Sequence, residues 1–146
     1  MSSKMDAPVQ TTPRAKPENL RARSLSLSLT VKDLQKSIHW YHYVVGFHQE
    51  RTWDRDGKMA GAAMVAGEVR INLNQDDWKK GRDRAMGEGF SIHLNTQHDV
   101  DEIAAGIKQR GGKLDAEPED RPWGVRSFYL TDPDGYKFGI QRPLQG

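Results

Sequence analysis

The chain contains no cysteine, so it can form no disulfide, offers no thiolate to a metal and has no thiol nucleophile. No apolar run approaches the length needed to cross a bilayer, and the first residues lack the apolar stretch of a secretory signal. Aromatic residues are few, at 8% of the chain, and the net charge is only +2. These absences predict a cytoplasmic protein with no membrane association.

The small positive charge is concentrated at the N-terminus. Residues 1–23 contain five Lys or Arg and two Asp or Glu, so this segment has a net charge of +3 and the remainder −1. The same segment holds three prolines and shows no hydrophobic periodicity, which predicts a disordered basic extension over 1–23. Because the rest of the chain is nearly neutral, nucleic acid is not expected as a partner. A second charged stretch, at 76–84, is predicted to be a solvated surface loop.

A strict alternation of leucine and serine opens the ordered part of the chain. Residues 24–31 read Ser-Leu-Ser-Leu-Ser-Leu-Thr-Val, which predicts a strand with leucines on one face and serines on the other. Asp33 occupies the position of a helix N-cap, apolar residues recur at helical spacing from Leu34 to Val45, and Gly46 ends the helix. Three strand candidates follow, at 48–54, 58–65 and 68–74.

The second half of the chain repeats this order. Residues 90–96 alternate in the same way, and a helix is predicted from Asp99 to the glycines at 111–112. Further strand candidates lie at 113–118, 125–131 and 136–141. The chain therefore reads βαβββ twice, as one α+β domain over 24–143. Module one covers 24–75, a polar linker 76–88 and module two 89–143.

The last hairpin carries the clearest family signature. Two alternating runs flank the turn Asp-Pro-Asp-Gly at 132–135. In order and spacing, the two modules and this hairpin resemble the vicinal-oxygen-chelate superfamily, which groups glyoxalases, bleomycin-resistance proteins, fosfomycin-resistance enzymes and extradiol dioxygenases. The resemblance implies a cup of strands with helices outside, a pocket between the inward faces of the modules, and a homodimer.

The resemblance also bears on metal binding. Metal-dependent members of the superfamily carry a glutamate ligand four residues after the turn glycine, and here that residue is Gly139. The corresponding positions on the other strands are Ser26, Asn72 and Ser91. Two hydroxyls, one amide and no side chain do not supply the imidazole and carboxylate donors that divalent ions require. The chain thus resembles the metal-free, bleomycin-resistance-like branch, and neither a metal nor another cofactor is expected.

Alternation places a set of mostly polar residues on the inward faces of the modules. The ligand-binding residues expected from it are Ser26, Ser28, Arg70, Asn72, Ser91, His93, Asn95 and Tyr129. The resemblance adds Trp53 and Trp123, which lie in segments that relatives use as pocket walls. His93 is the candidate catalytic residue, as a general acid or base, and a polar residue at the pocket floor or rim is the other interpretation. For each tryptophan, packing in the core or in a dimer interface is the alternative to stacking on a ligand.

Three functions are compatible with this sequence. The first is a protein that binds a planar or polyhydroxylated small molecule without a metal. The second is a cofactor-free enzyme in which His93 transfers a proton. The third is a metal-dependent lyase, thiol transferase or dioxygenase, which would require a different register on at least two strands.

Overall fold

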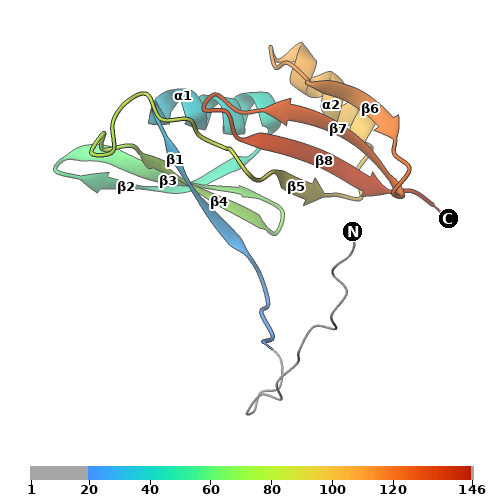
Figure 1. Ribbon diagram of the computed structural model, residues 1–146, viewed down its shortest axis with the longest axis horizontal. Helices are drawn as coiled ribbons and strands as arrows, with labels where there is room; N and C mark the ends of the chain where they lie inside the picture. Colours follow the sequence, from blue (N-terminus) through green and yellow to red (C-terminus); the bar gives the residue numbers. More distant parts are fainter. Residues whose placement is uncertain (1–19, 146) are drawn as a thin grey trace, which may run out of the picture.

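The computed structural model describes residues 20–145, so the predicted extension 1–23 lies outside the described residues except for its last four. The elements follow the βαβββ order twice (Figure 1), as predicted. In the first module they are β1 (Ser26–Val31), α1 (Leu34–His39), the π-helical turn η1 (Trp40–Val45), β2 (His48–Arg55), β3 (Lys58–Ala66) and β4 (Val69–Gln75). In the second they are β5 (Ile92–Asn95), α2 (Val100–Gln109), β6 (Ala116–Asp120), β7 (Val125–Thr131) and β8 (Lys137–Pro143). No helix among the described residues is long and apolar enough to cross a membrane.

Each module forms its own four-stranded mixed sheet. The strand orders are β1-β4-β3-β2 and β5-β8-β7-β6, with β1 parallel to β4 and β5 parallel to β8. Helix α1 packs on β3 and β4, and α2 packs on β6, β7 and β8. We call the sheet face that the helices do not cover the open face of each module. The glyoxalase fold predicted from the sequence is therefore the fold observed.

The alternation along the first strand of each module sorts most of its residues as predicted, although Leu25 lies before β1 and is 77% exposed. Leu29 and Val31 are buried in the core, whereas Ser26 and Ser28 are exposed on the open face. In module two, Ile92 is buried and His93 is exposed. Because successive residues of a strand point to opposite faces, the open faces carry the polar residues of both strands.

The first helix changes its winding halfway. Asp33 caps α1 as predicted and accepts a hydrogen bond from the N–H of Lys36 at 3.2 Å. From Trp40 onward the turns widen, and the N–H of Gly46 donates to the carbonyl of Tyr41, five residues earlier, at 3.0 Å. Val45, which regular α-helical spacing places in the core, is therefore only partly buried, and the preceding residue is buried instead.

The sixth strand lies later in the chain than predicted. Residues 113–118 were expected to form it, but β6 begins at Ala116 and its pairing with β7 is interrupted between Ala116 and Glu119. Pro118 lies inside this interruption. Proline has no N–H to donate to a neighbouring strand. It is tolerated in β6 because β6 is an edge strand.

One hydrophobic core extends through both modules. The ring of Tyr41 packs edge-on against Phe47 of its own module and against Phe138 of β8, with centroids 5.6 and 5.9 Å apart. At the end of α2 the chain passes so close to Val44 and Ile107 that a Cβ atom at Gly112 would collide with both. Only glycine lets the modules approach this closely.

A buried carboxylate joins the two modules. The hydroxyl of Tyr41 donates to Oδ2 of Asp132 at 2.7 Å, and Oδ1 accepts the N–H groups of Asp134 and Tyr136 at 2.9 and 2.8 Å. The Tyr136 hydroxyl in turn donates to the carbonyl of Thr30 at 2.9 Å. Burial raises the pKa of Tyr41 and also that of Asp132, whose three accepted hydrogen bonds only partly oppose the effect. The turn at 132–135 thus anchors module two to the helix of module one.

Candidate ligand-binding site

Gly139 lies at the centre of the open face of module two. The ladders place it directly opposite His93 on β5 and Tyr129 on β7. A Cβ atom at residue 139 would lie 2.9 Å from Nδ1 of His93 and 3.0 Å from Cε1 of Tyr129. Both distances are shorter than ordinary van der Waals contacts, so a side chain here would displace at least one ring. The two rings therefore occupy the space in which residue 139 would project.

His93 is held by a neighbour on its own strand. Oγ of Ser91 and Nε2 of His93 are 2.9 Å apart, which places both residues on the open face, as the alternation predicts. Because this hydrogen bond engages Nε2, Nδ1 is the nitrogen that lies over Gly139. The arrangement orients the imidazole and leaves one of its two nitrogens for a bound molecule.

Tyr129 is supported by a cation that the sequence did not assign to the site. The guanidinium carbon of Arg121 lies 5.0 Å from the centroid of the Tyr129 ring. Arg121 is fixed there because its Nε donates to Oγ of Ser127 at 3.0 Å and its Nη2 donates to the Ser127 carbonyl at 2.9 Å. The sequence signal was weak, because Arg121 lies before the strand predicted at 125–131 and Ser127 reads as one more alternating residue within it.

A cavity of about 290 Å³ opens beside Gly139, and module two alone supplies its walls. Its lining residues are Ser91, His93, Asp115, Tyr129, Leu130, Lys137, Phe138 and Gly139. The pocket expected between the modules is a separate cavity of about 530 Å³, lined by Gly46, Phe47 and Val69 of module one and by Leu94, Asn95 and Ile103 of module two. Of the predicted ligand-binding residues, Asn95 lines it.

The predicted residues of module one lie together on the other open face. In the β1–β4 ladder Ser28 stands opposite Asn72 and Ser26 opposite Arg70. Oδ1 of Asn72 is buried and has no hydrogen-bond partner among the described residues. Arg70 forms a bidentate ion pair with Glu50, to which both of its terminal nitrogens donate. These hydrogen bonds lower the pKa of the Glu50 carboxyl.

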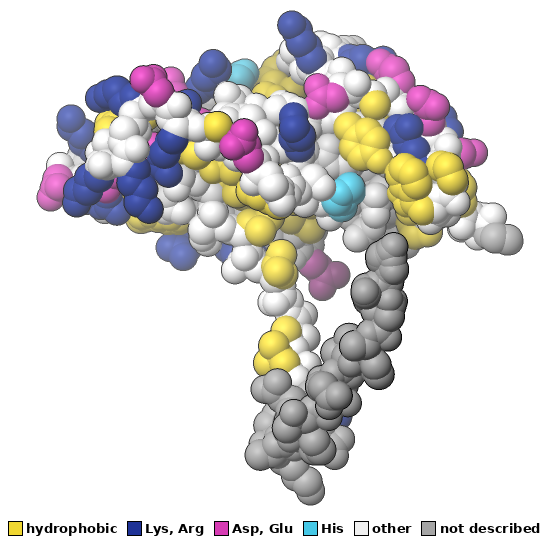
Figure 2. Space-filling view, in the orientation of Figure 1, with side chains coloured by type: hydrophobic (Ala, Val, Ile, Leu, Met, Phe, Trp, Pro, Cys, Tyr) yellow, Lys and Arg dark blue, Asp and Glu magenta, His cyan; other side chains and the backbone are white. Residues whose placement is uncertain are grey.

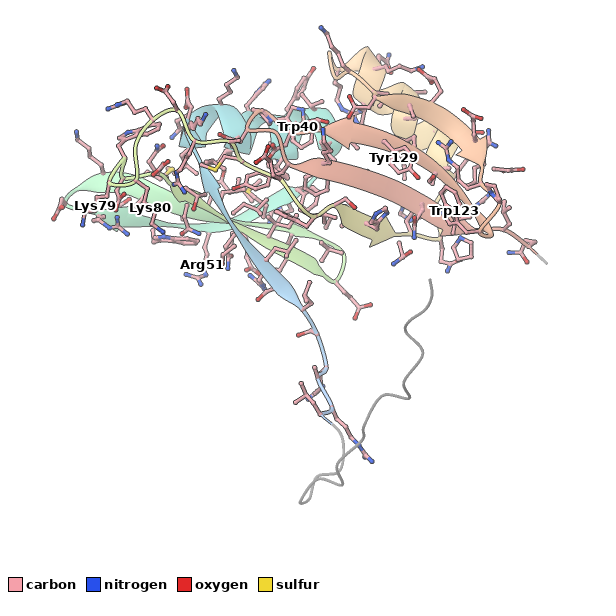
Figure 3. All side chains as sticks on the ribbon, viewed as in Figure 1. Trp40, Arg51, Lys79, Lys80, Trp123 and Tyr129 are labelled. Carbon is pink, nitrogen blue, oxygen red and sulfur yellow. The ribbon has the colours of Figure 1, made fainter. Side chains whose placement is uncertain are left out.

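The two predicted tryptophans occupy different settings. The Trp53 ring lies over Gly61 on the open face of module one, where a Cβ atom at Gly61 would collide with it. Trp123 is 64% exposed in the turn between β6 and β7, at the far end of module two (Figure 3). Asn95 is the last residue of β5, and its Oδ1 accepts a hydrogen bond from Nε2 of Gln141 at 2.9 Å. Neither Asn95 nor Trp123 lines the cavity beside Gly139.

The donors around Gly139 do not fit a divalent metal ion. The cavity offers one imidazole, His93, and one carboxylate, Asp115, which already accepts the hydroxyl of Thr131 at 2.5 Å. The open face of module one adds the hydroxyl of Ser28 and the amide of Asn72. Within residues 20–145 no three His, Asp or Glu side chains are grouped so that they could hold a metal. Divalent ions bound through nitrogen and oxygen ligands need a fuller set of imidazoles and carboxylates.

Comparison with known proteins agrees with this architecture. The model of the Glyoxalase/Bleomycin resistance protein/Dioxygenase superfamily matches residues 23–140. The chain is 25% identical over 118 residues to the glutathione transferase FosA of Serratia marcescens, covering 78% of this chain and 76% of that protein. A superfamily member from Sphaerobacter thermophilus has a TM-score of 0.67 at 28% identity, with 84% and 98% of the two chains covered. TnmS3, an antibiotic binding protein from Streptomyces sp. CB03234, has a TM-score of 0.66 at 25% identity, with 86% and 99% covered. The chain therefore belongs to the glyoxalase/bleomycin resistance protein/dioxygenase superfamily.

Proposed function

We propose that this protein binds a small organic molecule at the cavity beside Gly139 and that it does so without a metal ion. The observation that carries the proposal is the packing of His93 and Tyr129 over the glycine. In metal-dependent relatives the resemblance puts a ligating carboxylate at residue 139, and here two rings fill that space. The proposal thus assigns the chain to the metal-free, bleomycin-resistance-like branch.

The cavity favours a planar or polyhydroxylated ligand that is neutral or anionic. The Tyr129 ring provides a flat apolar surface, on which a planar molecule can stack. Ser91 and His93 supply hydrogen-bonding groups at the edge of that surface, and Lys137 supplies a positive charge. The likeness to TnmS3, an antibiotic binding protein, supports a small-molecule ligand.

Ligand screening with a matched pair of glycine variants tests the proposal. Planar phenols and aromatic carboxylates are titrated in the presence of a chelator, and backbone amide shifts are followed by NMR. A ligand should shift the amides of Ser91, His93 and Tyr129. Gly139→Ala should abolish the binding, because the added methyl group pushes against both rings. Gly106→Ala is the control, since its methyl group would meet only the flexible end of Arg110 on α2.

Two results would contradict the proposal. One is a ligand that binds only when a divalent ion is present. The other is a ligand that binds Gly139→Ala as tightly as the wild-type protein, which would place the site elsewhere.

A cofactor-free enzyme is the second candidate, and the bond between Ser91 and His93 favours it. With Nε2 engaged at 2.9 Å, Nδ1 faces the space over Gly139 and could transfer a proton in an isomerisation, elimination or hydrolysis. His93→Gln retains hydrogen bonding but removes proton transfer near neutral pH. Turnover should therefore disappear while ligand affinity persists, and undiminished turnover in this variant would exclude the mechanism.

We also propose that the protein forms a homodimer, as its resemblance to the superfamily suggests. The sheets end in four strands with one unpaired edge each, namely β1, β2, β5 and β6. Such edges favour association with another chain. Light scattering should give twice the 16.6 kDa of one chain, and the mass of a single chain would contradict the proposal.

A further inference from the structure

A second cavity lies at the far end of module one, where β1, β2 and the segment that follows β4 meet. It measures about 290 Å³ and is lined by Thr30, Arg55, Gln75, Asp76, Asp77, Lys79, Lys80 and Arg84. Figure 3 shows Lys79 and Lys80 next to each other at this end, and Figure 2 shows dark blue Lys and Arg side chains gathered there. We propose that this cavity binds a small molecule through a phosphate group, as a phosphomonoester.

The two carboxylates of the cavity are already engaged. Oδ1 of Asp76 accepts the N–H of Trp78 at 3.0 Å, and Oδ2 accepts Nη2 of Arg84 at 2.9 Å. Asp76 is only 5% exposed, but these bonds outweigh its burial and hold its pKa below the ordinary value. Oδ1 of Asp77 accepts the N–H of Lys79 at 3.0 Å. The segment 76–84 is thus internally hydrogen-bonded, and most of its residues are exposed, in agreement with the solvated surface loop that its sequence predicts; Asp76 is the buried exception.

The cations of the cavity remain available. Four basic residues line it against two carboxylates, which leaves an excess of positive charge. Within residues 20–145, Arg55, Lys79 and Lys80 form no ion pair with a carboxylate. Three cations from two parts of the chain, the end of β2 and the segment after β4, therefore line one space without a paired carboxylate of their own. An anion entering that space would be attracted from several sides.

Arg84 supplies an independent sign of a missing acceptor. Its Nη2 bonds to Asp76, but its Nε is buried and has no hydrogen-bond partner among the described residues. A buried N–H without an acceptor is unfavourable, and nearly all such groups in folded proteins are satisfied. Arg84 also lines the cavity, and a shift of its side chain would bring this N–H to a ligand oxygen there.

These features fit a phosphate better than a carboxylate. A phosphomonoester carries close to two negative charges near neutral pH and presents three acceptor oxygens. The cavity can match them with two lysine ammonium groups and the Arg55 guanidinium. A carboxylate has one charge and two oxygens, so it would leave part of this set unpaired. The volume of about 290 Å³ also leaves room for an organic group.

Titration with phenyl phosphate and inorganic phosphate tests the inference. The test variant is Lys79→Gln/Lys80→Gln, and the control is Lys36→Gln/Lys113→Gln, which removes the same charge from two other exposed lysines. Because all four lysines are exposed, both variants should fold. Phenyl phosphate should bind about tenfold or more weakly to the test variant and unchanged to the control. In NMR spectra the Trp78 amide and the 76–84 segment should shift.

The comparison of probes separates the possible ligands. Tighter binding of phenyl phosphate than of inorganic phosphate supports a phosphomonoester, and equal binding overturns the organic part of the inference. Equal losses in the test and control variants, or equal binding of benzoate and phenyl phosphate, would overturn the phosphate site. In the NMR titration Gly139→Ala should leave the phenyl phosphate shifts of the 76–84 segment unchanged, so failure at one cavity is distinguishable from failure at the other.

Discussion

Of the contacts that link the two modules, the hydrogen bond between Tyr41 and Asp132 is the easiest to test by mutation. Tyr41→Phe removes one hydroxyl and keeps the ring, whose packing against Phe47 and Phe138 stays unchanged. The lost hydrogen bond is 2.7 Å long, buried, and made to a carboxylate. Hydrogen bonds to charged groups contribute about 1.5–3 kcal/mol to the free energy of unfolding, and we expect a loss in this range.

Replacing the acceptor Asp132 should lower the free energy of unfolding more than Tyr41→Phe does. Asp132→Ala leaves the Tyr41 hydroxyl and the N–H groups of Asp134 and Tyr136 without their partner, all in a buried setting. Removing one member of a buried charged network typically costs about 3–5 kcal/mol. Urea denaturation followed by circular dichroism measures both variants. A Tyr41→Phe protein within about 0.5 kcal/mol of the wild type would refute the anchoring role assigned to this bond.

The pH dependence of the Tyr41→Phe effect provides a second check. Burial raises the pKa of Asp132, and the hydrogen bond from Tyr41 opposes that rise. Without the hydroxyl the folded variant should therefore bind the proton more tightly than the folded wild type. As pH falls through the raised pKa of Asp132, proton binding to this carboxyl stabilises the folded variant more than the folded wild type. The difference in the free energy of unfolding between the two proteins should therefore shrink. A difference in the free energy of unfolding that grows on acidification would contradict this direction of the pKa change.

Four further substitutions have effects that urea denaturation can measure. Gly139→Ala should reduce the free energy of unfolding by about 1–3 kcal/mol, because the methyl group forces two rings to move. Asp99→Ala should cost about 1 kcal/mol, since Asp99 caps α2 by accepting the N–H of Asp101 at 2.9 Å. Ile107→Ala should cost about 2–5 kcal/mol and Ile103→Ala less, because only Ile107 is fully buried. An equal cost at both isoleucines would contradict the packing described for α2.

Local patterns predicted the elements and their faces well. The alternation at β1 and β5 identified the strand faces, and Asp33 and Asp99 cap their helices as the sequence indicates. These features depend on neighbours within one element, which periodicity and capping rules describe. The widened turn at Tyr41 was missed because a π-helical turn has no such local signal.

The placement of the cavity depends on contacts that no local pattern records. Alternation identified His93 and Tyr129 as open-face residues but did not indicate that the cavity would lie within module two. Arg121, the first residue after the edge strand β6, contacts the Tyr129 ring of β7. The bond from Tyr41 to Asp132 spans 91 positions in the sequence. Periodicity reports the face on which a residue lies, whereas the relative placement of the sheets is set by such distant contacts.

Metal content is the most direct test of a ligand site that works without a metal. The untagged protein is exposed in turn to Ni, Zn, Mn, Fe(II) and Co, desalted, and analysed by mass spectrometry of the elements. The packing of His93 and Tyr129 over Gly139 predicts a stoichiometry close to zero for every ion, with ligand binding unaffected by chelation. About one ion per chain, lost together with ligand binding on chelation, would contradict the account.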